Sequence, residues 1–405
     1  MIIFFNLFYL LLGFILYKKV LRKYSNLLNH VSIFSVVWIF LILGSQLTEF
    51  VLLEEYTLTV VYLAWYFFLL GSYIFTDKIN VENNFQEILN IKLERNLKKL
   101  CYTLTLLSLI VNFDILKNVF FDFSSFSDWA QMRDDDVFSE FRDNNIMYTL
   151  FGNTSNIYIP ISIYLYVRKR IRVWTFALIY FIAILLALAT FNRAPLLFLL
   201  IISLVSYSFI AGKVPYKLIF SSTIIMLFLF VLTSYFLNVN SNNTESPSNL
   251  VFIYLFGGIS AYQNLLNHGY IVLSSLDSGY YSFDFINYIL KTLGIINTYP
   301  NLVREYDFNI MTNVYTYLDC FTLDFGIIGA FIGSFFIGLI SKFFYLKCVN
   351  NKSIFYLILY STFCYYASFI FMNNEYIRFG VILFMIKVYF LIITFKLINI
   401  EFRTH

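Results

Sequence analysis

Long apolar runs constrain the fold of this chain more than any other feature of its sequence. A transmembrane helix needs roughly 20 mainly apolar residues, because the hydrocarbon core of a bilayer is about 30 Å thick and a helix rises about 1.5 Å per residue. Runs of this length recur along the chain, and most lack the period-two alternation of an outer-membrane barrel. The sequence therefore predicts an all-α integral membrane protein, a polytopic helical bundle of about 11 (11–12) transmembrane helices.

The expected spans are distributed over the whole chain, so residues 1–405 are treated as a single polytopic membrane domain. They cover residues 2–17, 31–48, 57–76, 100–120, 146–167, 173–191, 195–211, 218–238, 321–341, 354–372 and 380–398. Two external connections, residues 121–145 and 239–320, are too long to be turns. The second contains two short apolar pieces, 251–262 and 285–296, which we expect to form re-entrant or interfacial helices.

Composition excludes several other classes of protein. Only 13% of the residues are charged and 60% are hydrophobic, whereas a soluble domain has about 25% charged residues. A water-soluble globule, a disordered chain, a nucleic-acid-binding module and a secreted disulfide scaffold are therefore excluded. The four cysteines and three histidines are scattered without the spacing of metal ligands. We accordingly predict no metal and no cofactor.

The charges divide between the two sides of the expected bundle. Lys18 and Lys19 follow the first span, which has no basic residue before it, and this pattern places the N-terminus outside. Alternating sides from there puts 20 basic and 5 acidic residues inside, including the basic residues of connection 342–352. The outside receives 7 basic and 19 acidic residues. This split obeys the positive-inside rule and predicts a cytoplasmic C-terminus.

The few external cations are the first candidates for binding an anionic substrate. Arg193 lies in a short turn, 192–195, where its guanidinium can bind a phosphate through two hydrogen bonds or can reach lipid headgroups. Arg378 lies just before the last span. Lys387 lies inside that span, so it must meet an anion or a water-filled cavity, or form a salt bridge such as one to Asp324.

The segment 301–329 closes the large loop and enters the ninth expected span. Asp324 lies near the external N-terminus of that helix, where it can stabilise charge, bind a sugar or cap the helix. Glycines at 326, 329 and 333 permit close helix packing. The candidate binding residues in the segment are Arg304, Asn313, Tyr315 and Thr316.

Three further groups have both a functional and a structural interpretation. His268 can act as a base near neutral pH or be an inert loop residue. Arg133 begins an acidic run, 133–136, that is a sugar or metal site or a solvated loop. The polar stripe 153–156 faces a substrate cavity or hydrogen-bonds neighbouring helices.

These motifs together resemble those of the Wzy-type oligosaccharide repeat-unit polymerases, which include the O-antigen and capsule polymerases of bacteria. The resemblance rests on the number of spans, one large external loop in the C-terminal half, and three motifs. These are Asn-Arg-Ala-Pro at 192–195, Asn-Val-Tyr-Thr at 313–316 and Asp-Phe-Gly-Ile-Ile-Gly at 324–329. The paired external loops with an Arg-x10-Gly pattern, described for such polymerases, are not found in this sequence.

The resemblance implies a glycosyltransferase of the bacterial plasma membrane. Its substrate would be an undecaprenyl-diphosphate-linked oligosaccharide, with membrane lipid, a chain-length regulator and a flippase as candidate partners. Arg193, Arg304, Asp324 and His268 would be the catalytic candidates. The substrate-binding candidates would be Arg378, Lys387, Asn313, Tyr315, Thr316 and Arg133.

Two other functions remain as alternatives at this stage. An O-antigen ligase would transfer the finished glycan to a lipid A core. A transporter, such as a lipid-linked oligosaccharide flippase, would have short loops and charged residues along a path through the membrane. The sequence favours the polymerase over the transporter, because about 80 residues form one external loop and few charges fall inside the spans.

Overall fold

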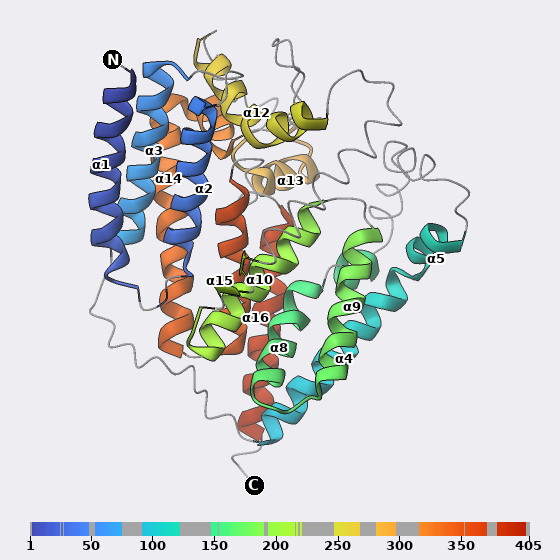
Figure 1. Ribbon diagram of the computed structural model, residues 1–405. Helices are drawn as coiled ribbons and strands as arrows, with labels where there is room; N and C mark the ends of the chain where they lie inside the picture. The colour runs from blue at the N-terminus through green and yellow to red at the C-terminus, as the bar shows by residue number, and fades with distance from the viewer. Residues whose placement is uncertain are drawn as a thin grey trace. The chain divides into compact units, whose positions relative to one another are not determined.

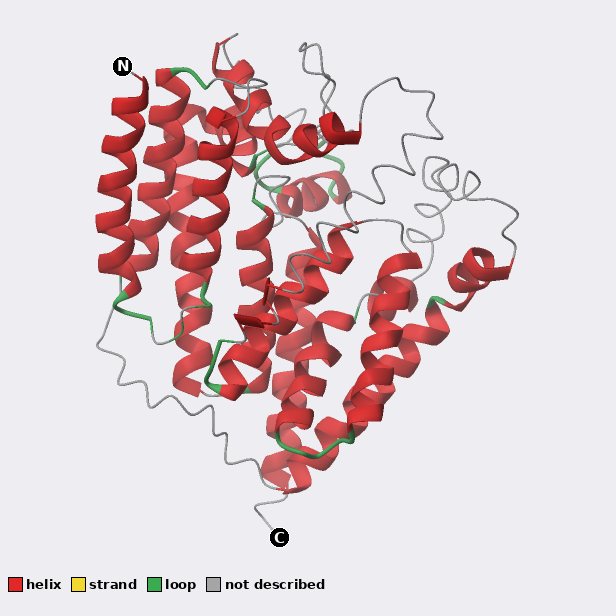
Figure 2. Ribbon diagram, in the orientation of Figure 1, coloured by secondary structure: helices red, strands yellow, loops and turns green. Residues whose placement is uncertain are grey.

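In the part of the chain that the computed structural model describes, the regular secondary structure is helical, and loops and turns join the helices (Figure 2). That part comprises residues 2–24, 26, 28–47, 53–74, 91–121, 147–152, 154–189, 193–214, 216–217, 219–220, 247–267, 281–296, 316–351, 353–370 and 379–401. The all-helical fold predicted from the apolar runs is confirmed within these residues.

Helices occupy most of the expected spans (Figure 1). They are α1 (Ile2–Leu21), α2 (His30–Leu47), α3 (Glu55–Tyr73), α4 (Ile91–Val111), α5 (Phe113–Phe121), the π-helix η1 (Tyr148–Gly152), α8 (Ser155–Val167), α9 (Val173–Ala189), α10 (Arg193–Ala211), α12 (Pro247–Asn267), α13 (Asp284–Thr292), α14 (Tyr317–Asn351), α15 (Ile354–Phe369) and α16 (Phe379–Glu401). Helices α12 and α13 form where two short apolar pieces were expected in the large loop. Most of the expected span 218–238 and of the loop 121–145 lies outside the described residues.

Three of these helices are long and apolar enough to cross a membrane, namely Glu55–Tyr73, Ala194–Ala211 and Tyr317–Asn351. Four shorter helices are also apolar, covering His30–Gln46, Val173–Leu188, Ile354–Phe369 and Val381–Thr394. The chain is therefore compatible with a membrane protein, and the larger number of spans stays a prediction.

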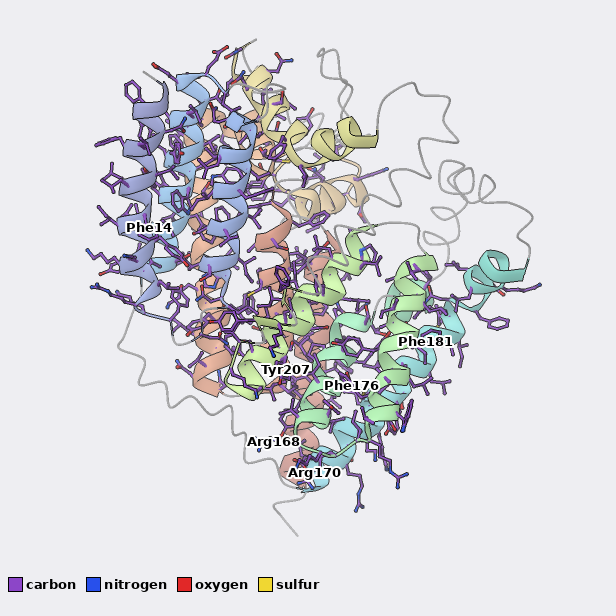
Figure 3. The ribbon with its side chains drawn as sticks, viewed as in Figure 1. Phe14, Arg168, Arg170, Phe176, Phe181 and Tyr207 are labelled. Atoms are coloured by element: carbon purple, nitrogen blue, oxygen red, sulfur yellow. The ribbon has the colours of Figure 1, made fainter. Side chains whose placement is uncertain are left out.

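Exposed apolar stripes on single helices support the same interpretation. On α14 the stripe consists of Ile328, Ile332, Phe336, Ile340 and Phe343, which recur every three or four residues and are all exposed. Comparable stripes run along α1 and α9, and Phe14 and Phe181 belong to them (Figure 3). Soluble monomers rarely expose apolar surface on this scale, which is compatible with stripes that face the lipid of a membrane.

Tertiary contacts group the chain into two compact units. Unit 1 comprises residues 1–82, 249–349 and 363–390, and unit 2 comprises residues 83–248, 350–362 and 391–405. The expectation of a single polytopic domain stays a prediction. Each unit is described below by itself.

In unit 1, α1, α2 and α3 run side by side (Figure 1). The backbones of α3 and α14 approach each other closely at glycine residues. A β-carbon added at Gly71 would collide with the backbone oxygen of Phe335, and one added at Gly338 would collide with that of Phe68. Such contacts between small residues let membrane helices approach closely where no hydrophobic driving force is available.

Most of the described charged residues of unit 1 lie toward its two ends, whereas Lys291 on α13 and Lys387 within α16 do not follow the separation by sign. One end, here called the basic end, carries Lys18, Lys19, Lys23, Lys342 and Lys347 from α1, α14 and the turn after α1. The other, here called the acidic end, carries Glu54, Glu55, Asp319 and Asp324. Connections 18–30 and 342–352, which the charge rule places on one side, thus meet at the same end of the unit, because Tyr24 contacts both His30 and Tyr345.

Unit 2 is built on contacts among α4, α8, α9 and α10. A turn between α8 and α9 presents Arg168 and Arg170 (Figure 3). Arg170 forms an ion pair of 2.5 Å with Glu94 of α4, whose side chain is only 10% exposed. This contact joins two connections that the charge rule also places on one side.

Candidate functional site

Helix α14 is broken at Gly326 into two parts of unequal length. Gly326 has φ 67° and ψ −168°, a combination that is essentially restricted to glycine. The hydroxyl of Tyr317 hydrogen-bonds that of Ser334 at 2.8 Å. In a straight helix these residues would lie about 25 Å apart, so residues 317–325 fold back along the start of the longer part. We call residues 317–325 the half-helix.

The half-helix packs closely on the part of α14 that follows the break. A β-carbon added at Gly333 would lie 2.5 Å from the ring of Phe321, and one at Gly329 would lie 2.5 Å from the Phe321 carbonyl oxygen. The glycines that the sequence assigned to close packing therefore serve a hairpin within α14. The ninth span expected over 321–341 falls within α14, and the structure adds a break at Gly326, which adopts a positive φ.

The half-helix is buried yet carries several polar side chains. Residues 317–324 are all buried, among them Asp319 and Asp324, each 2% exposed. The backbone N–H of Tyr317 donates to the carbonyl of Ile370, which anchors the half-helix to the end of α15. Non-helical backbone at membrane depth is tolerated only where protein or a water-filled cavity surrounds it. In many secondary transporters, discontinuous helices of this kind form the substrate and ion sites.

Asp324 joins the half-helix to the turn that precedes α13. Its two carboxylate oxygens accept hydrogen bonds from the backbone N–H groups of Tyr281, at 3.0 Å, and Ser282, at 2.6 Å. Phe325 next to it meets the ring of Phe283 edge-on at 6.0 Å. These hydrogen bonds from backbone N–H groups stabilise the charged carboxylate and fix the direction in which the chain enters α13. Asp324 thus organises the loop rather than capping α14 alone.

Asp319 is the second buried carboxylate, and sequence reasoning did not select it. Thr316 begins the half-helix and donates its hydroxyl to Asp319 at 2.7 Å. On the same half-helix, the hydroxyl of Thr322 shares a hydrogen bond of 2.9 Å with that of Tyr262 from α12. Two carboxylates, two threonine hydroxyls and a tyrosine hydroxyl therefore gather at the acidic end of unit 1. The spacing Thr-x-x-Asp before an apolar run was the available signal.

The other predicted site residues divide into three groups. Lys387 is half-buried on α16, and its pairing with Asp324 stays a prediction. Arg193 begins α10 in unit 2, but its side chain is outside the described part of the structure. The remaining candidates lie outside the described residues: Arg133, His268, Arg304, Asn313, Tyr315 and Arg378. The role of the external cations in binding an anionic substrate therefore also stays a prediction.

The polar stripe 153–156 behaves in part as a contact between helices. Thr154 donates its hydroxyl to the carbonyls of Phe151 and Leu104, the second of which belongs to α4. The side chain of Asn112, at the break between α4 and α5, donates to the carbonyl of Gly152 at 3.1 Å. For Thr154 the structural interpretation of the stripe therefore holds.

No group of three or more histidine, cysteine or acidic side chains that could hold a metal ion occurs among the described residues. Comparison of the chain with protein-family models, with curated proteins and with solved structures finds no match. The functional argument therefore rests on the geometry of the acidic end of unit 1.

Proposed function

We propose that this chain is a membrane glycosyltransferase that polymerises undecaprenyl-diphosphate-linked oligosaccharide repeat units into O-antigen or capsular polysaccharide. The observation that carries the proposal is the half-helix, which holds Asp319 and Asp324 in a buried polar cluster. Burying two carboxylates is costly, and such groups in a membrane protein usually mark a functional site. The resemblance of the motifs at 192–195, 313–316 and 324–329 to those of the Wzy-type polymerases supports the same function.

The chemistry of the proposed reaction matches the residue types present. The acceptor hydroxyl oxygen attacks the anomeric carbon of the donor, the bond from that carbon to the diphosphate oxygen breaks, and the hydroxyl proton passes to a base. Asp319 and Asp324 are candidates to orient the acceptor or to receive its proton. Arg193, Arg304, Arg378 and Lys387 are candidates to stabilise the leaving diphosphate.

The location of the cluster also fits a reaction on a lipid-linked substrate. The lipid-facing stripe of α14 begins at Ile328, one turn after Asp324, so this carboxylate, at the end of the half-helix, lies near the level where a bilayer would meet water. A lipid diphosphate has its charged group at this height. In the proposed topology this is the external face of the bacterial plasma membrane, with about 11 spans, an external N-terminus and a cytoplasmic C-terminus.

Changing Asp319 to asparagine is expected to abolish the long-chain glycan while the single-repeat product remains. Asparagine keeps an oxygen that can accept the Thr316 hydroxyl, so the change removes the charge at little cost to the fold. The measurement is the chain-length ladder of surface glycan in cells that carry the variant as their sole copy, with membrane abundance checked. Asp324→Asn is expected to give the same loss, with lower abundance because the asparagine side chain has one oxygen and can accept only one of the two backbone N–H hydrogen bonds.

Glu54→Gln is the matched control for Asp319→Asn. Glu54 is an exposed carboxylate at the same end of unit 1 and accepts a hydrogen bond from Asn267 at 3.0 Å. The control should leave the ladder unchanged. A normal ladder from Asp319→Asn would overturn the catalytic assignment. Deletion of the gene separates the related activities, since loss of a polymerase leaves one repeat on the core, whereas loss of a ligase leaves polymer on the lipid carrier.

A further inference from the structure

Lys342 is a buried cation that the proposed reaction does not use. It lies in the long part of α14 and is 1% exposed. The charge count places it in a connection after the ninth span, but α14 continues as a helix to Asn351 and carries Lys342 into the interior of unit 1. A fully buried lysine is rare unless an anion or a set of acceptors accompanies it.

The ammonium of Lys342 meets aromatic rings instead of acceptors. Its Nζ lies 4.0 Å from the ring centroid of Tyr24 and 5.0 Å from that of Tyr345. Among the described residues, no atom accepts a hydrogen bond from it. Three N–H donors therefore stay unused, and contacts with ring faces replace only part of the lost hydration.

The polar groups around this ammonium cannot serve as its counter-charge. Burial, and next the neighbouring Tyr345, raise the pKa of the Tyr24 phenol well above its ordinary value, so this hydroxyl stays neutral. Tyr24 donates its hydrogen to the carbonyl of Ser72 at 3.0 Å. It also shares a hydrogen bond of 3.2 Å with Nε2 of His30, which must then be the donor.

Within the described residues, the charged side chain that acts on Lys342 is also a cation. Lys23 lies close enough to oppose its charge, and it packs over the ring of Tyr73 at 3.4 Å. Of the acids of unit 1 that the structure describes, Glu54, Glu55 and Asp324 lie toward the other end of the unit, and Asp319 accepts a hydrogen bond from Thr316. Helix α3 separates the two ends by about 27 Å between Glu55 and Tyr73. An anion would therefore be attracted to this end and meet no repulsion from those acids.

Lys342 also lies at the height of the lipid headgroups. The exposed apolar stripe of α14 ends at Phe343, and Lys347 follows on the exposed face. On α1 the exposed apolar residues end at Ile15, and Lys18 and Lys19 follow. Both helices thus place the edge of the hydrocarbon layer at the level of Lys342, where lipid phosphates lie.

We propose that Lys342 and Lys23 form a phosphate-binding site within the basic end of unit 1, with Lys342 as its central cation and Lys347 outside it. The ligand is a phosphate anion, supplied by the headgroup of an anionic phospholipid or as free phosphate. Its oxygens would take up the unused donors of the Lys342 ammonium and offset the repulsion from Lys23. This site is separate from the acidic end of the same unit and does not depend on the proposed function.

The test is a thermal melt of the purified full-length chain in a neutral detergent. Wild-type protein should gain roughly 2–3 °C in Tm when phosphatidylglycerol, or inorganic phosphate, is added at about 10–100 times its Kd. Phosphatidylcholine at the same concentration should give no gain. In Lys342→Met the gain should disappear, and in Lys342→Arg it should be retained. Lys347→Met, an exposed lysine on the same helix, is the matched control and should keep the gain.

Each outcome decides the proposal. A gain with phosphatidylglycerol alone identifies the lipid headgroup as the source, and a gain with inorganic phosphate identifies the free anion. The proposal is overturned if neither ligand raises the Tm of the wild type, or if Lys342→Met retains the full gain. It is also overturned if Lys342→Met is more stable than the wild type with and without phosphate, since that is the behaviour of an unpaired buried charge.

Discussion

Alanine at Gly338 is expected to lower the Tm of the detergent-solubilised protein by about 2–4 °C. The added methyl group would collide with the backbone oxygen of Phe68, and neither α3 nor α14 can move a backbone atom without separating the two helices. Overpacking of this kind costs roughly 2–3 kcal/mol. Gly71→Ala should have a similar effect, because its methyl group would meet the backbone oxygen of Phe335. Size-exclusion chromatography after stepwise heating measures both variants.

Gly44→Ala is the control for these two substitutions. Its methyl group would meet the ring of Phe256, and the far end of a side chain can rotate away where a backbone oxygen cannot. If Gly338→Ala lowered the Tm no more than Gly44→Ala, the close α3–α14 contact would be contradicted. Ser72 also donates to the carbonyl of Gly338 at 3.5 Å, so separation of the helices removes this hydrogen bond as well.

Apolar length and charge distribution were enough to predict the helices that carry unit 1. The run 57–76 became α3, Glu55–Tyr73, because an apolar run of this length leaves the backbone no partners in lipid except its own. The same charge count placed connections 18–30 and 342–352 on one side, and Tyr24 and Tyr345 now lie in contact with a centroid distance of 4.6 Å. These are properties of single segments, which a sequence displays directly.

The important features of the site depend instead on contacts between segments distant in sequence. Asp324 was selected from its place near a helix start, but its partners, Tyr281 and Ser282, lie 43 and 42 residues away. Asp319 and Lys342 looked like ordinary charged residues at the edges of a span. They are buried because the half-helix folds back and because α14 extends to Asn351. A hydropathy profile cannot predict that these two residues are buried. Their burial depends on the backbone conformation of Gly326 and on tertiary packing.

The second large effect is expected at Gly326, where alanine should abolish glycan polymerisation and reduce stability together. A φ of 67° with ψ of −168° is unfavourable for any residue with a β-carbon, at a cost of about 3 kcal/mol. The half-helix can relieve that strain only by leaving its folded-back position. Doing so would break the Tyr317–Ser334 hydrogen bond and withdraw Asp324 from the amides before α13. The measurements are the glycan ladder and the Tm of the purified variant.

Gly294→Ala is the control that measures the effect of backbone strain without disruption of the half-helix. Gly294 also has a positive φ, of 70°, but nothing lies within 4 Å of the position its β-carbon would take, and it follows the end of α13. Alanine there should cost about 1 kcal/mol and leave the glycan ladder intact. If Gly326→Ala behaved in the same way, the break in α14 would not be needed to hold the two carboxylates. A ladder lost at Gly326 but kept at Gly294 would instead connect one backbone angle of α14 to the chemistry at the acidic end.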